Sequence, residues 1–120
     1  MTVPGPMTIT DTSTDVYYND DKRLGAALAA ALNEEILALA NAGCTWIQVD
    51  EPVFARNPDK ALDYGIENLE RCFHGLPDHV VLAVHMCCGY PDYLDQENFQ
   101  KADKMAYFQL SDAIEDSSIQ

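Results

Sequence analysis

Residues 45–52 read Thr-Trp-Ile-Gln-Val-Asp-Glu-Pro, and this stretch decides the fold class. Its first five residues are rich in β-branched and aromatic side chains, which predicts a buried strand over 45–49. Pro52 must end the strand, because proline has no N–H to donate to a neighbouring strand. Two carboxylates, Asp50 and Glu51, therefore stand at the carboxyl end of the strand.

A helix is predicted immediately before this strand. It begins at Asp21, with Asn19 or Asp20 as its N-terminal cap, and it stops at Gly43. The evidence is a series of apolar side chains at helical spacing, namely Leu24, Leu28, Leu32, Ile36 and Leu39.

A second helix is predicted after the strand, over 58–74, opened by Asn57. Its apolar face consists of Leu62, Ile66, Leu69 and Phe73. Residues 80–84 then form an almost wholly aliphatic strand, which is typical of a strand covered on both faces. After a loop over 88–95, a last helix is expected over about 99–116, with an inward face of Ala102, Ala106, Leu110, Ala113 and Ile114.

The first ten residues are harder to assign. Residues 2–10 are β-rich but interrupted by Gly5-Pro6, which indicates the end of a strand or a turn beside one. Strands and helices otherwise alternate, and this order predicts an α/β fold built from parallel βα units.

Composition excludes several classes of protein. The 120 residues include 7 Lys and Arg against 20 Asp and Glu, a net charge of −13, which argues against nucleic-acid binding through a basic patch. Apolar runs are too short for a membrane span, so no membrane is expected as a partner. The four cysteines include an adjacent pair and follow no secretory signal, which indicates reduced thiols in the cytoplasm.

His85 and Cys87 form the first candidate site, at the end of the third predicted strand. Side chains two residues apart on a strand leave the same face, so the pair could grip one ion, and imidazole and thiolate are both good zinc ligands. The alternative is a hydrogen-bonded histidine beside a buried apolar thiol. Cys88 also stays open as the sulfur ligand.

Asp50 and Glu51 form the second candidate site. A carboxylate after a buried strand must be paired, hydrated or neutralised, and one interpretation is an anchor for a cationic group of a substrate. The other is an acid that caps a helix or forms a salt bridge. Because ligands bind at the carboxyl ends of parallel strands, both candidate sites would meet at one edge of the sheet.

Three segments together resemble a known family. Gly5-Pro6-Met7-Thr8-Ile9, residues 47–52 (Ile-Gln-Val-Asp-Glu-Pro) and His85-Met86-Cys87, in this order and at this spacing, are similar to the catalytic barrel of cobalamin-independent methionine synthase. The resemblance runs over essentially the whole chain. It implies a zinc-dependent methyltransferase of methionine biosynthesis with a TIM (β/α)8 barrel.

The resemblance also implies roles for single residues. The zinc ligands of the family fall on His85 and Cys87, and the aspartate that holds the amino group of homocysteine falls on Asp50, with Glu51 beside it as a second substrate-binding candidate. Zinc would activate a small-molecule thiol for attack on an alkyl donor.

Two positions depart from the folate-dependent members of that family. Thr12 matches a tryptophan that helps hold the pterin, and Arg56 matches an acidic residue that contacts folate. The alkyl donor therefore stays open. Alternatives are a related transferase such as epoxyalkane:coenzyme M transferase, a corrinoid-dependent methyltransferase on a related barrel, or a truncated non-catalytic module.

Length sets the domain organisation. A complete (β/α)8 barrel takes about 250 residues, whereas residues 1–120 hold about three βα units. We expect a fragment of a single catalytic barrel domain, inactive alone, whose remaining zinc ligands and strands come from the rest of the same chain or from another chain.

Overall fold

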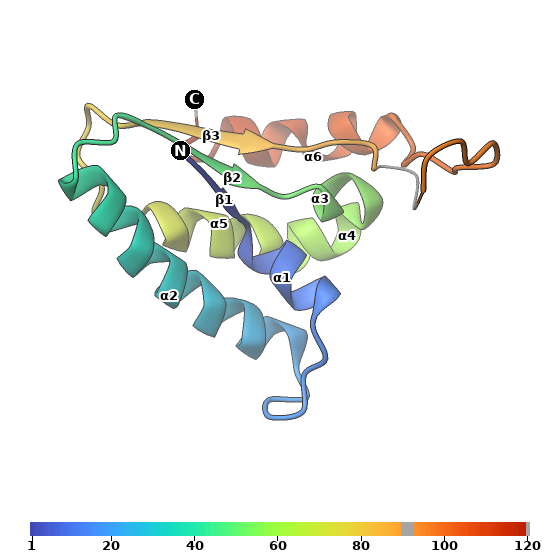
Figure 1. Ribbon diagram of the computed structural model, residues 1–120, viewed down its shortest axis with the longest axis horizontal. Helices are drawn as coiled ribbons and strands as arrows, with labels where there is room; N and C mark the ends of the chain where they lie inside the picture. The colour runs from blue at the N-terminus through green and yellow to red at the C-terminus, as the bar shows by residue number, and fades with distance from the viewer. Residues whose placement is uncertain (90–92, 120) are drawn as a thin grey trace.

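The computed structural model describes residues 1–89 and 93–119, and it centres on a parallel sheet with the strand order β1-β2-β3 (Figure 1). The strands are β1 (Thr2–Pro4), β2 (Trp46–Asp50) and β3 (Val81–His85). Their register pairs Thr2 with Gln48 and Asp50 with His85. The predicted α/β fold of parallel βα units, a portion of a TIM barrel, is confirmed.

The N-terminal segment differs from the prediction, because a helix follows the first strand. α1 spans Pro6–Thr12, where the sequence indicated only a strand end or a turn. Gly5 is still extended (φ −83°, ψ 156°), and Pro6 occupies the first turn of the helix. Proline is favoured there because its fixed φ suits a helix and its missing N–H would have had no partner within the helix.

α2 (Asp21–Asn41) confirms the first predicted helix and its cap. The Asp20 carboxylate accepts hydrogen bonds from the backbone N–H groups of Lys22 (3.0 Å) and Arg23 (3.2 Å). The chain leaves the helix through Gly43, whose φ of 97° is in the left-handed region.

The buried face of α2 differs in part from the predicted apolar row. Ile36 of that row is buried as predicted, but its four leucines are only half-buried, and the other buried positions are Gly25, Ala29 and Ala40. Small residues at three of these positions let α2 approach α1 and α5 closely, and the leucines cover the flanks of the contact. Contrary to the expectation that every apolar run is too short, α2 is long and apolar enough to cross a membrane, although core helices of globular proteins pass the same test of length and composition.

The second predicted helix forms over nearly its expected length, as one continuous helical stretch after the short helix α3 (Val53–Arg56). Its parts are α4 (Pro58–Lys60), the π-helix η1 (Ala61–Gly65) and α5 (Ile66–Phe73). Leu69 and Phe73 of the predicted apolar face are buried, but the wider π turn shifts the helical phase of the residues before it. Ala61, Tyr64 and Gly65 are buried, whereas Leu62 is 45% exposed.

Within the part of the chain that the structure describes, helices cover one face of the sheet, with α2 and α5 beneath it in Figure 1. Ile47 and Val49 of β2 are fully buried on that face, while Trp46 is 60% exposed on the other. All five residues of β3 are half-buried. The expectations of a buried strand over 45–49 and of a strand covered on both faces over 80–84 are therefore wrong within the described residues, where the helices pack against a single side.

α6 (Met105–Glu115) is shorter than the predicted helix. The Asp103 carboxylate accepts from the Met105 N–H (2.9 Å), and the Ala102 N–H donates to the carbonyl of Cys88 (2.9 Å). The second bond ties the segment before α6 to the loop after β3, and the first, a local bond, lies at the start of α6. Ala106 and Leu110 are buried as predicted, and the predicted loop over 88–95 lies partly outside the described residues.

Candidate functional site

The carboxyl ends of the three strands lie side by side and are joined by backbone hydrogen bonds. The Gly5 N–H donates to the carbonyl of Asp50 (2.8 Å), and the Glu51 N–H donates to the carbonyl of His85 (2.9 Å). Parallel pairing therefore continues one residue past the ends of β1 and β2. This edge collects the residues that the sequence singled out.

Asp50 and His85 are brought into direct contact. They are register partners on β2 and β3, so their side chains leave the same face of the sheet. Asp50 Oδ1 lies 3.2 Å from His85 Nδ1 and accepts a second hydrogen bond from Gln48 Nε2 at 2.8 Å. The two side chains are 36% and 38% exposed, so a small ligand can reach both.

Glu51 points the other way, into the core, and is fully buried. Its Oε1 accepts from the Met7 N–H (2.9 Å), and its Oε2 accepts from the Thr8 N–H (2.9 Å) and from Thr8 Oγ1 (2.6 Å). Glu51 thus caps the N-terminus of α1, the second of the two roles considered above. Its part in substrate binding stays a prediction.

Burial raises the pKa of Glu51 to about 7. The three hydrogen bonds to the carboxylate lower the pKa, but the effect of burial is larger. The carboxyl therefore changes its charge near neutral pH while it holds the start of α1. Gly5 is required beside it, because a Cβ at this position would lie 2.2 Å from Glu51 Cδ.

The two adjacent cysteines have different surroundings. Cys87 Sγ accepts from the Gly89 N–H at 3.4 Å, and Cys88 Sγ lies 3.4 Å from the hydroxyl of Tyr107 on α6. The hydrogen bond with Cys88 raises the pKa of Tyr107 to about 12. Cys87 follows His85 at the predicted spacing, and their shared use as metal ligands stays a prediction.

A metal site is not complete within the part of the chain that the structure describes. Among residues 1–89 and 93–119, no three His, Cys, Asp or Glu side chains are grouped closely enough to hold a metal ion. His85 and Cys87 offer two donors of the types that zinc prefers, and a catalytic zinc takes three protein ligands. The donor types fit zinc, and the third ligand must come from elsewhere.

The two positions that depart from the folate-dependent pattern differ in their surroundings. Thr12 ends α1, and its hydroxyl donates to the Thr8 carbonyl at 2.7 Å. Arg56 ends α3, and its side-chain stem approaches Gly89 in the loop after β3, since a Cβ on Gly89 would lie 3.8 Å from Arg56 Cδ. The stem of Arg56 therefore lies beside the loop that follows β3.

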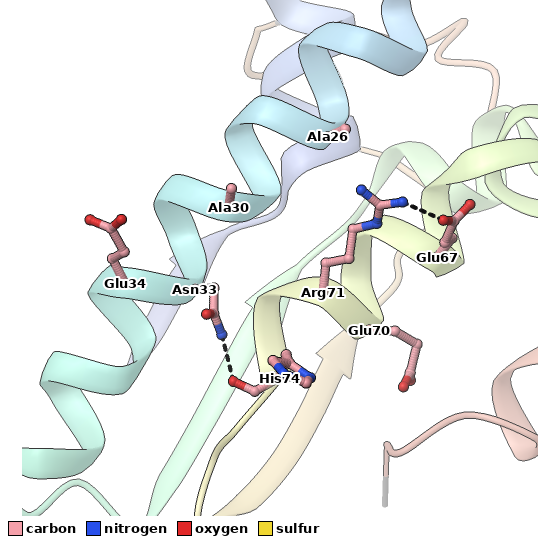
Figure 2. Close-up of a pocket in the computed structure, with 8 residues that line it drawn as sticks. All are labelled: Ala26, Ala30, Asn33, Glu34, Glu67, Glu70, Arg71 and His74. Atoms are coloured by element: carbon pink, nitrogen blue, oxygen red, sulfur yellow. Dashed lines mark hydrogen bonds and ion pairs between the residues drawn. The ribbon is translucent and has the colours of Figure 1, made fainter.

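A groove of about 620 Å³ lies elsewhere, between α2 and α5 (Figure 2). Ala26 and Ala30 line its α2 side, and Arg71 pairs with Glu67 on α5. Asn33 spans the two helices by donating to the carbonyls of Cys72 (2.9 Å) and His74 (2.8 Å). None of the residues at the strand ends lines this groove, and we assign the chemistry to the strand ends because the polar groups converge there.

The sequence did not predict the supporting contacts of three residues, namely Thr8, Gln48 and Tyr107. Gln48 could have been found, because strand alternation places it on the same face as Asp50. Thr8 and Tyr107 act on groups far away in the sequence, which spacing along the chain does not reveal.

Comparison with known proteins gives consistent matches. The model of the family "Cobalamin-independent synthase, Catalytic domain" matches residues 2–106. The methionine synthase of Thermococcus kodakarensis is 32% identical over 111 residues, covering 92% of this chain and 32% of that protein. The methionine synthase of Sulfurisphaera tokodaii is 34% identical over 95 residues, covering 79% of this chain and 27% of that protein.

A solved structure agrees with these sequence matches. The B12-independent methionine synthase from Shewanella sp. W3-18-1, in complex with selenomethionine, superposes with a TM-score of 0.83 at 33% identity. The match covers 99% of this chain and 35% of that one. The chain thus spans about a third of the length of the proteins it matches.

Proposed function

The chain belongs to the family of the cobalamin-independent synthase catalytic domain, and we therefore propose that it forms part of a zinc-dependent thiol alkyltransferase of the methionine synthase type. The observation that carries the proposal is the contact between Asp50 and His85 at the strand ends. His85 precedes Cys87 by two residues. These three residues supply part of the polar groups that a thiol acceptor and its metal would need.

In this proposal His85 and Cys87 hold zinc, which supplies Lewis-acid activation of a thiol at neutral pH. Asp50 binds the ammonium group of a homocysteine-like acceptor, because a half-exposed carboxylate beside the metal ligands is well placed for a cation. Cap contacts from Glu51 keep α1 in place at the same edge.

The remainder of the barrel is part of the proposal. Because the chain covers only 27% to 35% of the proteins compared above, we propose that the missing strands and the remaining zinc ligands come from further sequence of the same chain or from a second chain. The 120 residues are then one fragment of a single catalytic domain, inactive alone. The four free cysteines support a reducing, cytoplasmic location.

A second candidate function is alkyl transfer to an anionic thiol such as coenzyme M. Arg56 favours it, because its stem lies beside Gly89 near the strand ends and a sulfonate needs a cation. Asp50 favours an amino-acid thiol instead. The replacement of the pterin-binding tryptophan by Thr12 supports a donor other than methyltetrahydrofolate under either candidate.

The test is alkylation of homocysteine and of coenzyme M by a complete barrel that contains this chain, together with its zinc content. We expect stoichiometric zinc, methyl transfer to homocysteine, and loss of both in the His85→Ala and Cys87→Ala variants. Stoichiometric zinc after both substitutions, or none before them, would refute the proposal. Turnover of coenzyme M in place of homocysteine would select the second candidate.

A further inference from the structure

Gln48, Asp50 and His85 form a hydrogen-bonded row on the open face of the sheet. Gln48 and Asp50 lie two residues apart on β2, and His85 is the register partner of Asp50 on β3. Asp50 Oδ1 is the shared acceptor, 2.8 Å from Gln48 Nε2 and 3.2 Å from His85 Nδ1. A residue on each side therefore fixes the position of this carboxylate oxygen.

The chemistry of the row determines where the imidazole proton lies. An ionised carboxylate only accepts hydrogen bonds, so the ring nitrogen that faces it must donate. In neutral His85 the proton is then on Nδ1, and the lone pair is on Nε2. The Gln48 amide group likewise turns its N–H toward Oδ1, since its oxygen would be repelled there.

We infer that Asp50 is a positioning residue for His85. Asp50 keeps the imidazole of His85 in the Nδ1–H tautomer, so that Nε2 is the metal donor, and Gln48 in turn holds the Asp50 carboxylate in place. The metal half of the inference rests on the proposed function, whereas the tautomer does not. Histidines that bind metals commonly donate their other ring N–H to a carboxylate, and loss of that carboxylate weakens metal binding.

Asp50 then has one oxygen for each of two tasks. Oδ1 is occupied by Gln48 and His85. Among the described residues no hydrogen bond reaches Oδ2, which is therefore available to the ammonium group of an acceptor. One side chain would orient the metal ligand and place the substrate beside it.

The first measurement is the tautomer of His85 in the metal-free chain, read from the 15N shifts of its ring nitrogens under conditions in which the spectrum itself shows a neutral ring. We expect Nδ1–H for His85 and a return toward the Nε2–H form in Asp50→Ala. Asp11→Ala removes an exposed carboxylate of α1 and should leave the ring signals of His85 unchanged. The substitution His85→Gln assigns those signals.

The second measurement is zinc affinity by competition with a chelator. Asp50→Ala should weaken zinc binding by about 10- to 100-fold, and Gln48→Ala by less, while circular dichroism verifies that both variants are folded. An Nε2–H tautomer in the unsubstituted chain, or full zinc affinity in folded Asp50→Ala, would overturn the inference. An Nδ1–H tautomer in a chain whose complete barrel binds no zinc would support the positioning and refute the proposed function alone.

Discussion

The contact between Gly5 and Glu51 leads to a sharp prediction for the substitution Gly5→Ala. The backbone of Gly5 (φ −83°, ψ 156°) is open to any residue, so alanine adds no conformational strain. Its Cβ would nevertheless lie 2.2 Å from Glu51 Cδ and 2.3 Å from Oε1, far inside van der Waals contact. The Glu51 carboxylate must therefore leave its position.

The expected cost follows from the bonds that this movement breaks. Glu51 would lose its hydrogen bonds from the Met7 N–H and from both donors of Thr8. A hydrogen bond to a charged group contributes about 1.5–3 kcal/mol, but these bonds share one carboxylate whose burial penalty is relieved when it moves. We expect Gly5→Ala to lower the free energy of unfolding by about 2–4 kcal/mol.

The assay is urea unfolding followed by far-ultraviolet circular dichroism, at about pH 8 so that Glu51 is ionised. In a double-mutant cycle with Glu51→Ala, the obstructing atoms are gone, and Gly5→Ala should then cost under about 0.5 kcal/mol. Gly43→Ala is the control, because the φ of Gly43 is 97° and no atom lies within 4 Å of the added Cβ. It should therefore cost about 1 kcal/mol of backbone strain both in the unsubstituted chain and in Glu51→Ala. An equal cost of Gly5→Ala with and without the Glu51 side chain would refute the steric argument.

Further predictions concern protons, metal and substrate. The pKa of Glu51 is raised from 4.5 to about 7 in the folded chain. Its contribution to stability is therefore complete below about pH 4.5 and is lost as the pH rises through 7, at up to about 1.4 kcal/mol per pH unit. Glu51→Gln should remove this dependence of the unfolding free energy on pH, measured by urea titrations at a series of pH values. Zinc binding to the isolated chain should be weak, should strengthen with pH because zinc binds cysteine in its thiolate form, and should fall in His85→Ala and Cys87→Ala, as measured by chelator competition. Tight binding in both variants would contradict the ligand assignment. In a complete barrel, Asp50→Asn should weaken acceptor binding more than zinc binding, because an amide oxygen can still accept from His85 while the negative charge is gone. Equal losses of acceptor affinity and zinc affinity in calorimetric titrations would mean that Asp50 acts mainly on the metal.

Local patterns in the sequence were sufficient for most of the fold. The alternation within β2 and the cap at Asp20 both depend on neighbouring residues, and both predictions of an element were confirmed. α1 was missed because Gly5-Pro6 signals a turn and the start of a helix equally well. The helix rather than the turn forms here because the Glu51 carboxylate caps it, and Glu51 is 44 residues away from Met7 in the sequence.

Burial was harder to predict than the elements themselves. The identity of Trp46 favours burial, but its exposure depends on how many layers pack against the sheet, which no local pattern reveals. The π turn in η1 likewise moved Leu62 out of the apolar face, since one extra residue in a turn rotates the residues before it relative to those after it. At the candidate site, spacing placed Asp50 and His85 at one edge, and the register turned that proximity into a hydrogen bond.

The exposed indole of Trp46 gives the chain a built-in optical probe. It is the single tryptophan of the sequence, and it lies on the same face of β2 as Asp50. Its emission is therefore that of a ring largely surrounded by water, and any protein layer that closes over this face would shift the emission to shorter wavelength. Assembly around the strand ends can thus be followed by fluorescence without a label, in the same solution in which metal and thiol are titrated.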